Sequence, residues 1–454
     1  MSLSLTETLA ALESGALTAR GLVEQSLDRA AEYADLNAFI AVDAEALRAA
    51  AAESDGRRGS GRAGVLEGAA LAVKDNIDTA DLPTTGGTPA LTGPAASDAP
   101  PLARLRAEGA LVAGKANLHE LAFGITSNNA AFGPVRNPHD PARIAGGSSG
   151  GTAAAIAAGI VPAGLGTDTG GSIRVPSALC GIVGFRPTVD RYPTGGVVPL
   201  SPTRDTIGPM ARTVSDVALL DGVMAEDRAP LDPVAPENIR LGVPRRVLWE
   251  GLEPEVAARC EQALDRLGAA GITLVETDPA DLWADDAAAS FPIVLFETMR
   301  DLPAYCAARG VDFDALLAGV ASPDVRGILE SQLGEGAMPE AAYRAAMTLH
   351  RPAMQRNWSA WFEAQNLHAA LFPTTPLRAR PIGEDETVNL NGADLPTFAT
   401  FIRNTDHGSV MGVPGISLPL PGDGLPVGLA LDGLAGADRA LLAVAATLER
   451  LLND

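Results

Sequence analysis

The sequence of 454 residues predicts an α/β fold with one large sheet in a single domain, residues 1–454. Hydrophobic residues make up 46% and charged residues 20% of the chain, which is enough apolar material for a sizeable core. Short apolar runs alternate with amphipathic segments, as in a sheet covered by helices. Length alone would suggest two or three domains. Strand-forming runs lie on both sides of a long helical stretch, however, and this favours one sheet.

Residues 1–60 are predicted to form a helical lead-in. Apolar positions recur at helical spacing from Thr6 to Ala52, and Thr18 is placed as an N-cap. The stretch SDGRRGSGRAG then separates the lead-in from GAALAVKDNI, a run that predicts a buried strand ending at Lys74. We place the catalytic core in residues 61–215.

Within the core, the chain predicts alternating helices and strands. Helices are expected at APPLARLRAEG, NLHELAFG and TAAAIAAG, strands at ALVAG and VPAGLGTD, and a polar loop at ITSNNAAFGPVRNPHDPAR. Residues 235–275 repeat the order strand, helix, strand. A mostly helical insert over 280–365 follows, and the chain ends with strands at LHAALFPTTP, GISLPLP and GLPVGLALDG before the amphipathic helix DRALLAVAATLERLL.

Charge and targeting signals narrow the partners. The formal charge of −22 opposes binding to nucleic acid or to anionic membranes. The N-terminus lacks a signal peptide, and no run approaches the roughly 18 apolar residues of a spanning helix, so we expect a cytoplasmic protein. Cys180, Cys260 and Cys306 are expected to be reduced core thiols. Neither a metal nor a cofactor is expected.

Two glycine- and serine-rich segments carry the chemistry. GGSSGG, residues 146–151, precedes a helix whose N-terminal N–H groups favour negative charge. TGGS, residues 169–172, follows a strand, and its glycines allow successive N–H groups to turn towards one oxyanion. A serine nucleophile needs a base. Burial of Lys74 would lower the pKa of its amine and allow it to accept a proton.

Other interpretations of these residues stay open. The two segments could be simple turns, and Lys74 could reach solvent from its strand end. GGSSGG also satisfies the G-x-S-x-G pattern, but it lacks the preceding strand of a nucleophile elbow. Asp406 and His407 are adjacent, so they are poor candidates for the acid and base of a triad. GALVAGKA ends in Ala116, where a phosphate-binding loop needs a hydroxyl.

Together, VKDNI, GGSSGG and GTDTGGSIRVPS resemble the amidase signature family of serine hydrolases. Ser148 and Ser172 lie 24 residues apart, which is the family spacing. The resemblance covers nearly the whole chain and implies one α/β/α domain around a large mixed sheet. It also implies amide hydrolysis through an acyl-enzyme, without metal or cofactor.

The resemblance assigns roles to individual residues. Ser172 would be the nucleophile, Ser148 a bridging serine reached through a cis peptide, and Lys74 the terminal base. The predicted oxyanion donors are the N–H groups of Thr169, Gly170, Gly171 and Ser172. Supporting contacts are expected from Ser149, Asp168 and Arg174.

Longer segments, including KANLHELAFGITSNNAAFGPVRNP and TFIRNTDHGS, resemble indoleacetamide and mandelamide hydrolases. This implies a small amide substrate with an apolar or aromatic acyl group, although carbamates, anilides and esters share the chemistry. The small Gly124 is expected to leave room for a bulky acyl group. The residues expected beside the substrate are Ala122, Phe123, Gly124, Ile125, Thr126 and Ile402.

Three further expectations concern assembly and alternative functions. We expect a monomer or a homodimer. The alternative enzyme is the amidase subunit of a tRNA-dependent glutamyl amidotransferase, which resembles this chain in the same core. A non-catalytic binding protein that retains the fold is the third hypothesis.

Overall fold

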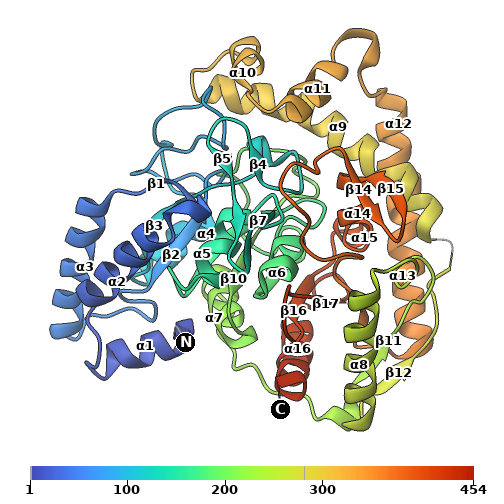
Figure 1. The fold of residues 1–454 in the computed structure, drawn as a ribbon, viewed down its shortest axis with the longest axis horizontal. Coiled ribbons are helices and arrows are strands. Elements are labelled where there is room, and N and C mark those ends of the chain that lie inside the picture. The colour runs from blue at the N-terminus through green and yellow to red at the C-terminus, as the bar shows by residue number, and fades with distance from the viewer. Residues whose placement is uncertain (1–2, 281, 454) are drawn as a thin grey trace.

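A computed structural model describes residues 3–280 and 282–453 of the chain (Figure 1). Within this part, one mixed sheet of eleven strands runs through the molecule, in the order β1-β3-β2-β8-β10-β9-β16-β17-β13-β11-β12. The strands are β1 (Phe39–Ala41), β3 (Leu111–Ala116), β2 (Ala70–Lys74), β8 (Ala163–Asp168), β10 (Thr206–Ala211), β9 (Val183–Arg186), β16 (Gly415–Pro419), β17 (Gly428–Asp432), β13 (Ala369–Pro373), β11 (Arg240–Gly242) and β12 (Thr273–Val275). The predicted fold class, one large mixed sheet covered by helices, is confirmed.

The alternation of side chains along β2 shows how the sheet divides the core. Leu71 and Val73 belong to a cluster formed with helices on one face, whereas Ala70 and Ala72 pack with helices on the other. The first face is covered by α4 (Pro100–Ala107), α7 (Val214–Met224), α8 (Pro254–Ala269) and α16 (Asp438–Asn453). Because successive side chains alternate, Lys74 lies on the same face as Ala72.

Small-residue helices and the N-terminal lead-in cover that second face. They are α5 (Gly150–Ala157), α6 (Arg174–Cys180), α2 (Ala19–Glu32) and α3 (Ala44–Gly59), and α1 (Leu5–Glu13) precedes them. The Thr18 side chain accepts a hydrogen bond from the Gly21 N–H at 3.0 Å, which confirms the predicted N-cap. The three cysteines are buried and free, as predicted.

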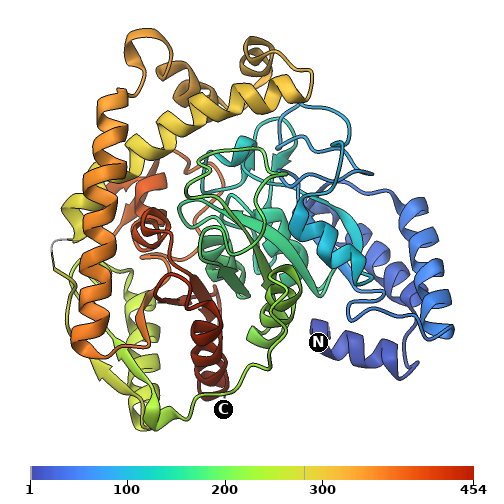
Figure 2. The same ribbon diagram turned by 180° about the vertical axis from the view of Figure 1, so that it is seen from behind.

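The helical insert wraps around one edge and the top of the molecule (Figures 1 and 2). Its helices are α9 (Leu282–Ala308), α10 (Phe313–Gly319), α11 (Pro323–Ser331), α12 (Glu340–Ala345) and α13 (Arg351–Gln365), with a π-turn at Ala346–His350. The orange helix α13 runs beside β11 and the red C-terminal segments, so the insert packs on the C-terminal half of the sheet.

Two local predictions were wrong. NLHELAFG forms only a 3-10 turn at Glu120–Ala122, with φ of 51° at Leu121 and 60° at Ala122. Tertiary bonds override its helical pattern, because the Leu121 N–H donates to Gly86 O and the Glu120 carboxylate accepts from two N–H groups before α11. The predicted polar loop contains four short strands, β4 (Asn128–Asn129), β5 (Gly133–Pro134), β6 (Arg136–Asn137) and β7 (Asp140–Ile144).

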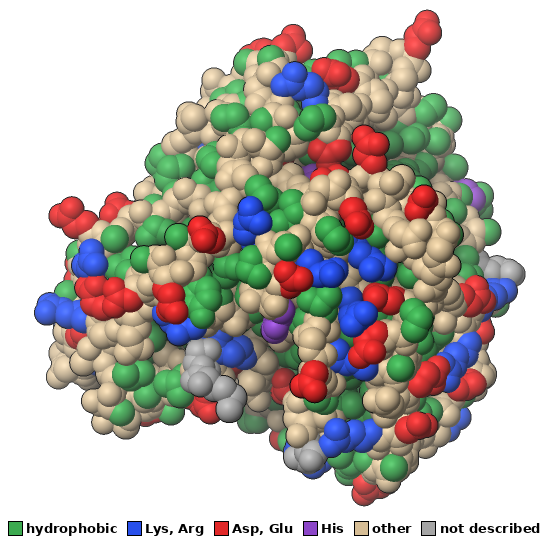
Figure 3. Space-filling view, in the orientation of Figure 1, with side chains coloured by type: hydrophobic (Ala, Val, Ile, Leu, Met, Phe, Trp, Pro, Cys, Tyr) green, Lys and Arg blue, Asp and Glu red, His purple; other side chains and the backbone are tan. Residues whose placement is uncertain are grey.

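Three short elements near the C-terminal end complete the frame. A hairpin of β14 (Thr387–Leu390) and β15 (Ala393–Pro396) leads into α14 (Thr397–Ile402) and α15 (Asp406–Met411). The face in Figure 3 carries acidic side chains interspersed with basic ones. None of the helices in residues 3–280 and 282–453 has the length and hydropathy needed to cross a membrane.

Candidate active site

Lys74 ends β2 and is fully buried on the face that carries α5. Its Nζ lies 2.7 Å from Ser148 Oγ and 2.7 Å from Thr167 Oγ1, and the Asn76 amide also donates to Thr167 Oγ1 at 3.0 Å. Burial lowers the pKa of Lys74 from 10.5 to about 7, while Asp168 and Asp205 act in the opposite direction. A large share of the amine is therefore neutral near pH 7.

Ser148 and Ser149 form the turn that begins α5. The Gly147–Ser148 peptide is cis, and the Ser148 carbonyl accepts from the His119 N–H at 3.3 Å. Ser149 is the N-cap residue of α5 and hydrogen-bonds nearby, as predicted, because its hydroxyl donates to Thr167 O at 3.1 Å. Both serines are thus fixed against the segment that contains Thr167.

Ser172 lies between β8 and α6, directly beside this turn. Its carbonyl accepts a hydrogen bond from the Ser149 N–H at 3.1 Å. Within the described part of the chain, the hydroxyls of Ser148 and Ser172 share no hydrogen bond. The structure therefore brings Lys74, Ser148 and Ser172 together, with the link from lysine to the first serine formed and the link between the two serines open.

The predicted oxyanion loop has one donor fewer than the sequence suggested. The Gly171 N–H already donates to Asp168 Oδ1 at 2.8 Å, so we remove it from the predicted set. The N–H groups of Thr169, Gly170 and Ser172 have no acceptor among the described residues. Gly171 has φ of 132°, and a side chain there would collide with Thr405.

Asp168 and Arg174 form a buried ion pair behind this loop. Arg174 Nε donates to Asp168 Oδ2 at 3.1 Å, and Arg186 Nη1 donates to Asp168 Oδ1 at 3.1 Å. Burial disfavours the charged carboxylate, but the two guanidinium groups outweigh that effect and hold the pKa of Asp168 below its usual range. A charged Asp168 can therefore keep its hydrogen bond from the Gly171 N–H.

Arg186 was missed by the sequence analysis, although a signal for it exists. It ends the apolar run GIVGFR, in the same way that Lys74 ends GAALAVK. A cation that closes a buried strand could have been considered at both positions.

Comparisons with known proteins decide the family. The amidase family model matches residues 21–442. An indoleacetamide hydrolase of Allorhizobium ampelinum is 40% identical over 99% of this chain and 98% of its own length. A mandelamide hydrolase of Pseudomonas putida is 41% identical over 99% and 92%. A crystal structure of an amidase superposes with a TM-score of 0.90 at 36% identity, covering 99% of this chain and all of the other.

The chain belongs to the amidase signature family. It is therefore a hydrolase that acts on the carbon–nitrogen bond of amides.

The acyl side of this amidase is a cavity of about 260 Å³ that opens beside Ser172. Four residues that we predicted beside the substrate line it: Ala122, Phe123, Ile125 and Ile402. Apolar side chains from the insert and its neighbours complete most of the wall, and these are Leu200, Phe291, Val294, Leu295, Ile328 and Phe398. Polar groups are contributed by Thr169, Arg204, Ser290, Ser331, Gln332 and Asp406.

Two predicted substrate contacts of the amidase do not line this cavity. A side chain at Gly124 would collide with the His119 ring, so this glycine makes room for a histidine and not for an acyl group. The Thr126 hydroxyl donates to Asp385 Oδ1 at 2.7 Å and joins the loop to the segment before β14. Both residues support the wall of the cavity from outside.

His407 is not placed to act as a base in this amidase. Its ring packs against Trp283, Trp358 and Phe372, with centroid distances of 5.4 to 5.7 Å. Burial, and then the charge of Arg174, lower the pKa of His407 to about 3. This agrees with the exclusion of an Asp406–His407 triad.

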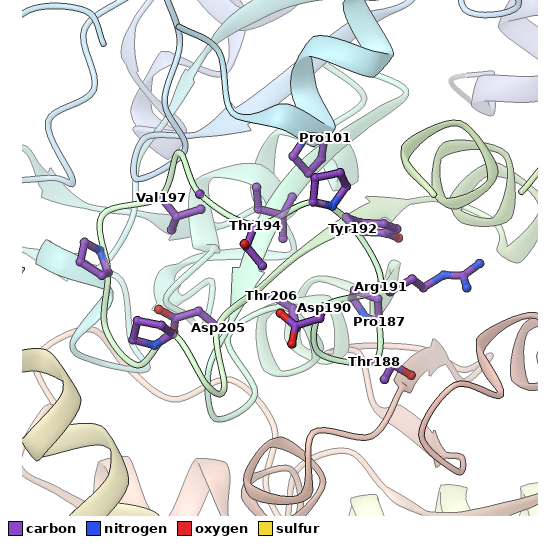
Figure 4. A pocket seen from close by; sticks show the side chains of 15 residues that line it. Pro101, Pro187, Thr188, Asp190, Arg191, Tyr192, Thr194, Val197, Asp205 and Thr206 are labelled. Carbon is purple, nitrogen blue, oxygen red and sulfur yellow. The ribbon is translucent and has the colours of Figure 1, made fainter. Parts of the chain in front are cut away.

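A second cavity of about 170 Å³ lies under the loop 187–199 (Figure 4). Pro101, Tyr192 and Thr194 surround it, and Asp205 and Thr206 stand at its wall. It contains none of the predicted site residues. Asp205 connects it to the oxyanion loop, because Asp205 Oδ1 accepts from the Thr169 hydroxyl at 2.5 Å.

Proposed function

We propose that this amidase hydrolyses small amides with apolar or aromatic acyl groups through an acyl-enzyme on Ser172. The observation that carries the proposal is the buried Lys74 amine, 2.7 Å from the Ser148 hydroxyl, next to a serine at the wall of an apolar cavity. A lysine with a pKa of about 7 is well suited to general-base chemistry at neutral pH.

The reaction would begin with a proton relay. Neutral Lys74 takes the proton of Ser148 as Ser148 takes the proton of Ser172, and Ser172 Oγ attacks the amide carbonyl carbon. The open link between the serines requires the Ser172 side chain to rotate when substrate binds, as catalytic hydrogen bonds often tighten only in the complex. The relay run in reverse protonates the departing amine, and water then hydrolyses the acyl-enzyme by the same steps.

The oxyanion would be received by the free N–H groups of Thr169, Gly170 and Ser172. Donors held in place before reaction stabilise the developing charge strongly in a site that excludes water, and each is worth about 10²–10³ in rate. Asp168 supports this arrangement by occupying the Gly171 N–H and fixing the turn.

The substrate class follows from the cavity wall. Its side chains are mostly apolar and come from four separate segments, which suits an uncharged acyl group. The names of the two relatives, indoleacetamide hydrolase and mandelamide hydrolase, point to amides with aromatic acyl groups. Carbamates, anilides and esters could react at the same serine. The amidotransferase alternative is not favoured, since these relatives match along nearly their full lengths.

The test is hydrolysis of an arylacetamide by the purified chain, followed as release of ammonia and acid. Ser172→Ala should lower kcat by more than about 10⁴-fold, because nothing else can form the acyl bond. The matched control is Ser215→Ala, at an exposed position of α7, which should leave kcat unchanged. Wild-type hydrolysis by Ser172→Ala would refute the proposal. A fluorophosphonate should label Ser172 stoichiometrically, and failure to label would favour a binding protein.

A further inference from the structure

Each carbonyl group of the loop from Asp168 to Gly171 accepts a hydrogen bond. Arg186 Nη1 donates to Asp168 O at 2.5 Å, and Arg204 Nε donates to Thr169 O at 3.0 Å. The next two donors are the Thr405 hydroxyl, 2.7 Å from Gly170 O, and the Val175 N–H, 2.8 Å from Gly171 O. The four peptide planes are therefore oriented from their carbonyl sides.

Orienting a carbonyl also orients the N–H group of the same peptide. In a trans peptide the two groups point in opposite directions, and the peptides of this loop are trans. The Gly170–Gly171 peptide illustrates the geometry, because its carbonyl meets Thr405 while its N–H meets Asp168. By the same geometry, the bond from Arg204 to Thr169 O sets the direction of the Gly170 N–H, which has no acceptor of its own among the described residues.

Arg204 is held by groups from two further elements. It is almost fully buried, and its Nη2 forms an ion pair with the Asp406 carboxylate at the start of α15. Its Nη1 donates to Ser290 O at 3.1 Å and to Ser290 Oγ at 3.3 Å, on α9. Ser290 and Asp406 both line the acyl cavity. One guanidinium group thus joins the oxyanion loop to two walls of the acyl cavity.

We propose that Arg204 is a positioning residue that aims the Gly170 N–H at the oxyanion, and that Asp406 holds Arg204 in place. The proposal rests on the function proposed above, since it needs a tetrahedral intermediate on Ser172. Arginine suits the role because its planar fork offers separate N–H groups to Thr169, Ser290 and Asp406. A lysine has one nitrogen and cannot reproduce that geometry.

The experiment compares Arg204→Lys with the wild type in three measurements. We expect kcat to fall about 10- to 100-fold, because one oxyanion donor is misaimed and not removed. The affinity for an aryl trifluoromethyl ketone, which forms a tetrahedral adduct on Ser172, should fall by a similar factor. In a Ser172→Ala background, Arg204→Lys should leave the Kd of the substrate amide nearly unchanged. A purely structural role would not produce this split.

The matched control is Thr405→Val, which removes a buried hydrogen bond from the next peptide of the same loop. The N–H of that peptide is occupied by Asp168, so Thr405→Val should cost much less ketone affinity than Arg204→Lys. If Arg204→Lys does not fold, Asp406→Asn decides, since it keeps the shape of the carboxylate and removes its charge. It should also lower kcat and ketone affinity together.

The outcomes separate the two proposals. Equal losses of ketone affinity in Arg204→Lys and Thr405→Val would overturn the positioning role, and so would a loss confined to substrate Kd. Activity that survives in Ser172→Ala would instead overturn the proposed function.

Discussion

Two lysines lie fully buried at the ends of neighbouring parallel strands, and their surroundings differ. Lys74 ends β2, and its Nζ meets the hydroxyls of Ser148 and Thr167. Lys115 lies one residue before the end of β3, and its Nζ is 3.3 Å from the Asp75 carboxylate and 2.7 Å from Ile77 O. In the register of the two strands Lys115 pairs with Val73, so the two amines project from opposite faces of the sheet.

The difference teaches what a buried lysine needs in order to act as a base. Burial lowers the pKa of both amines. At Lys115 the adjacent carboxylate counteracts this and favours the ammonium ion, whereas Lys74 contacts only neutral groups. The charges of Asp168 and Asp205 reach Lys74 from outside its hydrogen-bonding partners. Lys115 is thus suited to hold the segment after β2, and Lys74 to exchange a proton.

The strongest way to break this comparison is to remove each amine in turn. Lys74→Met should lower kcat about 10²- to 10⁴-fold, the usual contribution of a positioned base, with little loss of stability because a buried amine is replaced by an apolar chain. Steady-state kinetics on an arylacetamide would measure the effect. A Lys74→Met variant that retains wild-type kcat would remove lysine from the mechanism.

Lys115→Met should behave differently, because it leaves the Asp75 carboxylate buried without its cation. Breaking a buried ion pair from one side costs about 3–5 kcal/mol in the free energy of unfolding, which urea denaturation would measure. The double variant Lys115→Met with Asp75→Asn should recover part of that loss. If the single variant were as stable as the wild type but as inactive as Lys74→Met, the assignment of the two roles would be reversed.

The sequence predicted the chemistry of Lys74 because the relevant signals are local. An apolar run that ends in a lysine fixes both the strand and the burial of its last residue, and the structure has β2 ending at Lys74. The turn at Ser148 and the helix that follows it are equally local. The eleven-stranded sheet was predicted in kind, but its strand order depends on pairings between distant segments.

Predictions that failed depended on contacts across the fold. Gly124 faces the His119 ring only because Leu121 and Ala122 adopt left-handed conformations, which the helical pattern of NLHELAFG did not indicate. The N–H of Gly171 is taken by a carboxylate that the turn folds back onto it. Arg204 and the cavity residues of α9 lie far from Ser172 in the chain, so no local pattern connects them with it.

The pH dependence of the reaction sharpens the comparison between the two lysines. A general base works in its neutral form, so kcat/KM should fall about tenfold per pH unit below the pKa of Lys74, near 7, and level off above it. The sign is that of a group that loses function on protonation. Initial rates between pH 5.5 and 9 would give the apparent pKa. In Lys115→Met this midpoint should stay where it is in the wild type, because the altered amine projects from the other face of the sheet. A flat profile, or a midpoint that moves when Lys115 is changed, would mean that Lys74 is not the group that takes the proton.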